Sequence, residues 1–126
     1  MSRIYSSEQV SRGHVDKICD QIADAIVTDC LAHDKDSRVA VEVLIKNDTV
    51  VIAGEITTKH TPDYAALVMG VMAKIGIDKL GYSSIDVRGL ITKQSPDIAM
   101  GVDKSLEARN GDTDPLDTGA GDQGMM

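Results

Sequence analysis

The spacing of apolar residues changes its period along the chain, and this change constrains the fold more than any other feature of the sequence. Between residues 15 and 30, apolar side chains recur at helical spacing, with acidic residues on another stripe. Residues 38–46 alternate as in a strand, and a second β-branched run follows Asn47-Asp48 up to Ile56. We therefore predict a helix of about four turns, followed by a β-hairpin turned at Asn47-Asp48.

A second helix is predicted from Thr61 and Pro62, which suit an N-cap and a first helical turn, to Gly76, which suits a helix stop. A strand is expected near residues 86–91, and a short strand around Ile4 is expected before the first helix. This order predicts an α+β fold, a two-layer β-α-β-β-α-β unit whose helices pack on one face of a mixed, mostly antiparallel sheet.

Beyond Gln94 the sequence changes character, because residues 95–124 hold five glycines and two prolines with little apolar periodicity. A structureless stretch this long is usually a functional loop or a linker. Such a segment buries too little apolar surface to offset its ordering cost, so we expect it to be mobile without ligand. We therefore divide the chain into an α+β domain over residues 1–93 and a flexible segment over residues 94–126.

Composition excludes several classes of function. The 126 residues include 13 Lys and Arg against 20 Asp and Glu, a net charge of -7, which leaves no basic stripe for a nucleic-acid backbone. Phe and Trp are absent, which nearly excludes base stacking on aromatic platforms. No apolar stretch approaches the roughly 20 residues that span a bilayer. We expect a cytoplasmic protein that binds neither nucleic acid nor membrane.

The two cysteines are not expected to pair. Cys19 and Cys30 lie on the predicted first helix, about 16 Å apart along its axis. A disulfide requires Cα atoms within about 7 Å of each other. Both thiols are therefore predicted to be small core residues in a reducing compartment.

The start of the first helix carries the first candidate for chemistry. His14, Asp16 and Lys17 follow Gly13 at a position where free backbone N–H groups and the helix dipole favour an anion. An imidazole, a carboxylate and an ammonium there suit a metal-phosphate complex. An acidic residue that only complements the dipole of an ordinary helix start explains the same residues.

Three further candidates lie on strands and loops. Glu42 alternates with a valine face, and Glu55 ends an apolar strand beside a glycine, although both also fit ordinary solvent-facing carboxylates. The segments 93–98 and 119–124 bracket the long loop, and their glycines allow close approach to a ligand or simply make the loop flexible. His33 and His60 are assigned no role. An acidic cation-binding loop within residues 103–117 is a weaker alternative, because it lacks the glycine and terminal glutamate of an EF-hand.

Five segments of the chain, taken in sequence order, resemble the amino-terminal part of the S-adenosylmethionine synthetase family. The first block is similar to the family's SESVSEGHPDKICDQ. The matching blocks are Ser7-Glu8 to Asp20-Gln21, Arg38 to Glu42, Gly54-Glu55-Ile56-Thr57-Thr58, Lys93 to Ile98 and Gly119 to Gly124.

The resemblance implies an enzyme that joins methionine to the C5′ carbon of ATP and then hydrolyses the released triphosphate to phosphate and pyrophosphate. It implies Mg2+ and K+ as cofactors, and ATP and L-methionine as substrates. By position, His14 would donate to the leaving-group oxygen and act as the catalytic residue. The implied contacts are ATP at His14 and Lys17, Mg2+ at Asp16, K+ at Glu42, and methionine at Glu55, Gln94 and Asp122.

The resemblance also implies a mobile gate that begins at Gln94, and an active site shared between subunits of a homodimer or homotetramer. Two positions depart from the family pattern, since Arg12 replaces a glutamate and Val15 replaces a proline. These departures leave open a second function, a non-catalytic regulatory or partner module that keeps the fold. We expect the isolated 126-residue chain to be inactive.

Overall fold

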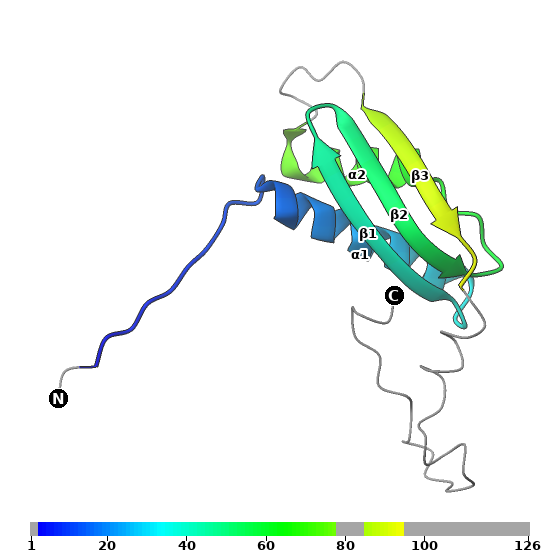
Figure 1. Ribbon diagram of the computed structural model, residues 1–126, viewed down its shortest axis with the longest axis horizontal. Helices are drawn as coiled ribbons and strands as arrows, with labels where there is room; N and C mark the ends of the chain where they lie inside the picture. Colours follow the sequence, from blue (N-terminus) through cyan, green and yellow to red (C-terminus); the bar gives the residue numbers. More distant parts are fainter. Residues whose placement is uncertain (1–2, 78–84, 95–126) are drawn as a thin grey trace, which may run out of the picture.

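A computed structural model describes residues 3–77 and 85–94 of the chain. Two helices cover one face of a three-stranded sheet, so the fold is a two-layer α+β unit, as predicted (Figure 1). The elements are helix α1 (Val15–His33), strand β1 (Arg38–Lys46), strand β2 (Thr49–Thr57), helix α2 (Tyr64–Ile75) and strand β3 (Asp86–Thr92).

The sheet has the order β1-β2-β3 and is mixed. Strands β1 and β2 form the predicted antiparallel hairpin, in which Arg38 pairs with Thr57 and Lys46 with Thr49. Asn47 turns the hairpin in the left-handed region at a φ of 56°, which asparagine tolerates better than most residues. Strand β3 runs parallel to β2. A parallel pair needs a crossover connection, and α2 provides it.

The core lies between the helices and the sheet, and it is aliphatic because the sequence has no Phe or Trp. One stripe of each helix and one face of β2 supply its buried side chains. They are Ile18, Ile22, Ile26 and Cys30 from α1, Val50, Ile52 and Ile56 from β2, and Val68, Val71, Met72 and Ile75 from α2.

Both cysteines are free, as predicted. Cys30 is fully buried in the core, whereas Cys19 is partly buried. Burial raises the pKa of both thiols, and the nearby carboxylates add to this effect. Because the thiolate is the reactive form, neither cysteine is suited to act as a nucleophile.

The helix boundaries differ from the predicted ones. Helix α1 continues past residue 30 to His33. Helix α2 is capped by Asp63, not by Thr61, because the Asp63 carboxylate accepts a hydrogen bond from the Ala66 backbone N–H at 3.0 Å. Gly76 ends α2 in the left-handed conformation, as predicted.

The expected strand around Ile4 is absent. Residues 3–10 form no strand, and Ile4 is 94% exposed. A strand needs a neighbour for its backbone hydrogen bonds, and this segment runs away from both edges of the sheet (Figure 1). The described order is therefore α-β-β-α-β. Neither described helix has the length and apolarity needed to cross a bilayer.

Candidate functional site

The first candidate cluster lies at the start of α1, where His14 is the N-cap residue. Its ring Nδ1 accepts a hydrogen bond from the backbone N–H of Asp16 at 3.3 Å. The His14 side chain is 46% exposed, and that of Asp16 is 89% exposed. A neutral imidazole has one acceptor and one donor nitrogen. With Nδ1 accepting, the ring carries its proton on Nε2 and offers it as a donor.

Lys17 holds the segment before the helix against the first helical turn. Its Nζ donates to the Val10 carbonyl at 3.0 Å. We call His14, Asp16 and Lys17 the helix-start cluster. It presents an imidazole, a carboxylate and an ammonium at the positive end of a 19-residue helix, where a phosphate group and its cation are favoured.

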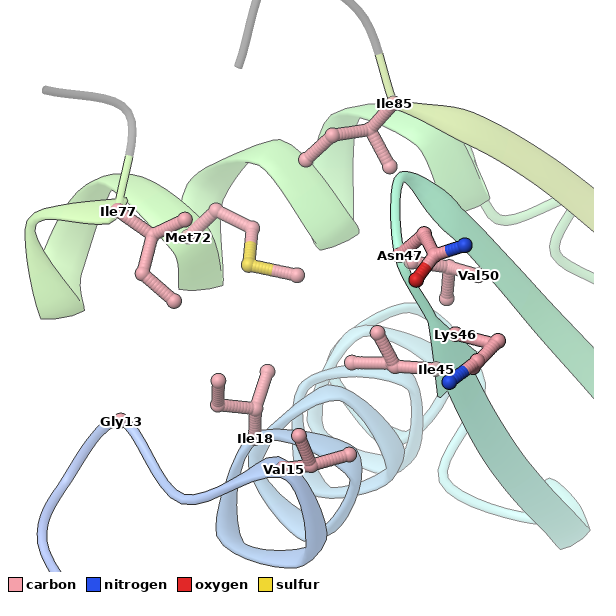
Figure 2. A pocket seen from close by; sticks show the side chains of 10 residues that line it. All are labelled: Gly13, Val15, Ile18, Ile45, Lys46, Asn47, Val50, Met72, Ile77 and Ile85. Atoms are coloured by element: carbon pink, nitrogen blue, oxygen red, sulfur yellow. The ribbon is translucent and has the colours of Figure 1, made fainter. Parts of the chain in front are cut away.

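A cavity of about 440 Å³ lies beside this cluster, between the start of α1, the end of α2 and the hairpin turn (Figure 2). Most of the side chains around it are aliphatic, and none of the predicted site residues that the structure describes lines it. The cavity is therefore not the place where those residues meet. Its lining residues are Gly13, Val15, Ile18, Ile45, Lys46, Asn47, Val50, Met72, Ile77 and Ile85.

The second candidate, Glu55, lies near the end of β2, where it pairs with Ala40 on one side and Thr92 on the other. The preceding Gly54 has a φ of 143°, and a Cβ there would overlap the Ala40 carbonyl oxygen. Only glycine allows this close approach of β1 and β2. The strand pairing therefore fixes the backbone that carries Glu55.

Gln94 lies two residues beyond β3, at the same end of the sheet as Glu55. Its Oε1 is buried and has no hydrogen-bond partner among the described residues. Leaving a buried polar atom unpaired costs about 1 to 3 kcal/mol. A donor group of a bound ligand would remove this cost, so Gln94 is suited to ligand contact.

Glu42 is exposed on β1 and lies opposite the valine face, as predicted. It pairs with Ala53, so it and Glu55 share the sheet face that the helices do not cover, which we call the open face. The two carboxylates are diagonal neighbours across β1 and β2, with their backbones about 7 to 8 Å apart. Asp122 lies outside the described residues.

The structure does not bring all the predicted site residues together. The start of α1 lies beside the hairpin turn, since Gly13 and Asn47 line one cavity. Glu55 is six residues from the beginning of β2 at Thr49, about 20 Å along the strand. The helix-start cluster therefore lies at one end of the domain, and Glu55 and Gln94 lie at the other.

One side-chain cluster was missed by the sequence analysis. Asp29, His33 and His60 place one potential metal-ligating atom each within 4.8 Å of one another. Asp29 and His33 have the i,i+4 spacing of neighbours on a helix, but the predicted helix ended at residue 30 and left His33 outside it. His60 comes from the connection between β2 and α2, and no local pattern links it to α1.

Comparison with known proteins identifies the family. Residues 2–96 match the family described as "S-adenosylmethionine synthetase, N-terminal domain". The chain is 53% identical over 127 residues to an S-adenosylmethionine synthase of Lacticaseibacillus casei, covering 98% of this chain and 32% of that protein. It is 44% identical over 131 residues to an S-adenosylmethionine synthase of Clostridium tetani, covering 100% of this chain and 34% of that protein.

A solved structure, described as an unusual S-adenosylmethionine synthetase from Campylobacter jejuni, matches with a TM-score of 0.65 at 38% identity. The match covers 75% of this chain and 27% of that chain. The chain therefore belongs to the S-adenosylmethionine synthetase family, and its described fold is that of the family's N-terminal domain. It spans about a third of the length of the curated relatives it matches.

Proposed function

We propose that this chain is the amino-terminal part of an enzyme that forms S-adenosylmethionine from ATP and L-methionine, with release of phosphate and pyrophosphate. The observation that carries the proposal is the family match over residues 2–96, joined to 53% identity with a named synthase over nearly the whole chain. Because the chain spans about a third of such relatives, we expect it to be inactive when isolated.

The proposed reaction places its main electrostatic demand on the leaving group. The methionine sulfur attacks C5′ of ATP and becomes a sulfonium, while the bond from C5′ to the triphosphate oxygen breaks. Negative charge develops on that oxygen, and a preorganised donor stabilises it more in the transition state than in the ground state. The Nε2 proton of His14 suits this role, because Nδ1 is already engaged by the Asp16 backbone.

The rest of the helix-start cluster suits the triphosphate and its cation. The Asp16 carboxylate is almost fully exposed, and Mg2+ is typically bound by one or two carboxylates together with substrate phosphates and water. Lys17 uses one of its three N–H donors on Val10, which leaves two for phosphate oxygens. When bound, Mg2+ would neutralise charge on the triphosphate.

The opposite end of the sheet suits the amino acid. We propose that the Glu55 carboxylate and the Gln94 amide oxygen accept hydrogen bonds from the ammonium group of methionine, with Asp122 as a further partner. The buried Oε1 of Gln94, which has no hydrogen-bond partner among the described residues, supports this role. We assign K+ to Glu42, whose exposed carboxylate on the open face offers the hard oxygen ligand that such a cation requires.

An active site shared between two subunits accounts for the distance between these groups within one chain. The helix-start cluster of one subunit would then meet Glu55 and Gln94 of another. Leu44 and Leu90 support such an assembly, because they lie on β1 and β3 with 60% and 65% of their surface exposed. We propose a homodimer or homotetramer that buries the open face, in a cytoplasmic enzyme.

The experiment compares variants of the purified protein that carries this chain. His14→Asn is expected to lower kcat about 100-fold or more, with a much smaller change in the methionine KM, because the lost hydrogen bond acts chiefly in the transition state. Asp16→Asn is expected to raise the Mg2+ concentration needed for half-maximal rate. Asp20→Asn is the matched control, since Asp20 is an exposed carboxylate one turn further along α1.

Two outcomes would contradict the proposal. An unchanged turnover of the His14 variant would remove His14 from the chemistry and leave an ordinary capped helix start. No S-adenosylmethionine synthesis by the complete wild-type protein that carries this chain, with ATP, methionine, Mg2+ and K+ supplied, would favour the non-catalytic module. Arg12 and Val15 motivate that second reading; both are exposed beside His14.

A further inference from the structure

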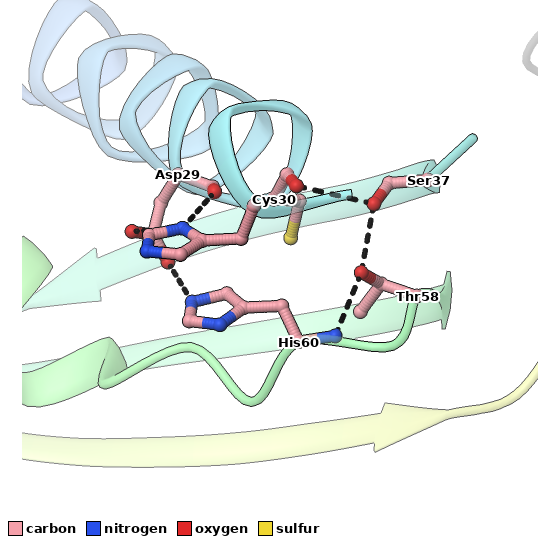
Figure 3. Close-up of polar contacts among 6 residues, drawn as sticks. Asp29, Cys30, Ser37, Thr58 and His60 are labelled. Carbon is pink, nitrogen blue, oxygen red and sulfur yellow. Dashed lines mark hydrogen bonds and ion pairs between the residues drawn. The ribbon is translucent and has the colours of Figure 1, made fainter. Parts of the chain in front are cut away.

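Asp29, His33 and His60 form a cluster at the end of α1 that the proposed reaction does not use. Asp29 and His33 lie one turn apart near the end of the helix, and His60 lies in the connection from β2 to α2. Figure 3 shows Asp29 and His60 facing each other from the helix and the connection. Their potential ligand atoms, together with one from His33, lie within 4.8 Å of one another.

Two of the three side chains are already held in position. His60 Nε2 lies 2.7 Å from an Asp29 carboxylate oxygen, and each side chain is 22% exposed. The connection that carries His60 is fixed in turn, because the His60 backbone N–H donates to Thr58 Oγ1 at 3.2 Å. The Ser37 hydroxyl bridges Thr58 and the Cys30 carbonyl of α1, at 2.7 Å and 3.2 Å (Figure 3).

The third side chain, His33, is close to the other two and half exposed. Its Nδ1 lies 2.8 Å from the Asp29 backbone carbonyl and 3.6 Å from the Asp29 carboxylate. Its ring stacks on that of His60, with centroids 3.9 Å apart and an angle of 6° between the planes. Stacked rings aim their nitrogen lone pairs in parallel, so one ring must turn before both can bind one ion. The 55% exposure of His33 leaves room for that turn.

We propose that Asp29, His33 and His60 bind one divalent transition-metal ion. Two imidazole nitrogens and one carboxylate oxygen are the ligand set of open zinc sites, in which water fills the fourth position. Imidazole favours Zn2+, Ni2+ and Cu2+, whereas Mg2+ favours oxygen ligands. The site therefore differs in metal class from the one proposed at Asp16.

The site is also separate from the helix-start cluster. Asp29 lies fifteen positions after His14, the N-cap residue, along one continuous helix, which corresponds to about 22 Å. An ion bound by Asp29, His33 and His60 would join the end of α1 to the connection that follows β2. Metal binding would therefore stabilise the folded chain, because the ligands come together only when the fold has formed.

The test measures Zn2+ binding to the purified metal-free protein by calorimetry and thermal unfolding, with excess Mg2+ present throughout. We expect one Zn2+ per chain and a higher Tm. His33→Gln is expected to weaken Zn2+ binding by more than about 100-fold. Loss of a residue that only hydrogen-bonds to a metal ligand typically weakens binding by about 10- to 100-fold. His60→Gln should act similarly. His14→Gln is the matched control, because it removes a comparably exposed histidine from the other end of α1.

Co2+ provides an independent readout of the ligands, and we expect d–d bands in its visible spectrum without the near-ultraviolet charge-transfer band that a thiolate ligand produces. His33→Gln loses the stacking on His60 as well as a hydrogen bond within its own helix, so its metal-free Tm is measured in parallel and should stay close to that of the wild type because the side chain is half exposed. A loss of binding in this variant then reports a lost ligand. Zn2+ binding that is absent from the wild type, unchanged in His33→Gln, or equally reduced in His14→Gln would each overturn the proposal.

Discussion

At the start of α1, His14 and Lys17 are held by residues two and seven positions away in the sequence. At its end, Asp34 and Asp29 are bound by residues 25 and 31 positions away. The first set of contacts needs little more than the helix and the segment before it. The second set forms only when α1 packs beside the end of β2.

This difference matters for how each end is expected to work. His14 and Asp16 are exposed, and the helix-start cluster is held by local contacts, so a change there should leave the core undisturbed. The end of β2 is fixed by pairing with β1 and β3, and the connection that follows it is bound to the carboxylates of Asp34 and Asp29 at the end of α1, so Glu55 has a preorganised backbone. A change at the second end should therefore affect stability more than a comparable change at the first.

The largest effect is expected from paired glycine substitutions at the two ends. Gly54→Ala forces a side chain into a positive φ and against the Ala40 carbonyl, at a cost of about 3 kcal/mol or more. Gly13→Ala should be close to neutral, because a Cβ there meets nothing within 4 Å. Urea unfolding of both variants measures the difference. Equal free energies of unfolding would show that the two ends are held alike.

Much of the fold was predictable because its signals are local. The helical period over residues 15–30, the alternation over 38–46 and the Asn47-Asp48 turn each specify a conformation within a few residues. The cap at Asp63 was missed because the Thr61-Pro62 pair gives a competing start signal. The prediction of a strand around Ile4 was wrong for another reason. A strand forms only beside a neighbouring strand, and local sequence does not reveal whether one is available.

The candidate site was less predictable than the fold. Alternation correctly assigned Glu42 to the face opposite the valines, because strand geometry alone decides it. The cluster of Asp29, His33 and His60 depends on packing between residues 31 positions apart, which no single periodicity encodes. The separation of His14 from Glu55 likewise follows from topology, since α1 starts beside the hairpin turn and Glu55 lies towards the other end of β2.

A smaller effect is expected from the caps of the two helices. Asp63→Ala should destabilise the protein by about 1 kcal/mol, because it removes the 3.0 Å bond to the Ala66 N–H. His14→Ala should cost less than about 0.5 kcal/mol, because its cap bond is longer, at 3.3 Å, and half exposed. Thermal unfolding distinguishes the two, at roughly 4 to 8 °C per kcal/mol. A larger drop in Tm for His14→Ala than for Asp63→Ala would contradict this prediction.

The smallest effect is expected in the pH dependence of the Asp34 contact. The Lys59 backbone N–H donates to the Asp34 carboxylate at 2.9 Å, and this bond, with that from Asp36, holds the pKa of Asp34 below its ordinary value of 3.8. A carboxyl whose pKa is lowered by folding stabilises the protein above the unfolded pKa, and that stabilisation is lost as the pH falls through the folded pKa.

Asp34→Asn should therefore be less stable than the wild type at pH 6, and this difference in the free energy of unfolding should narrow below pH 3.8. Urea unfolding at pH 6 and below pH 3.8 measures this difference between variant and wild type. Asp36→Asn is the control, because Asp36 is an exposed neighbouring carboxylate. A gap that stays constant with pH would show that the Asp34 charge contributes nothing to holding the end of β2 against α1.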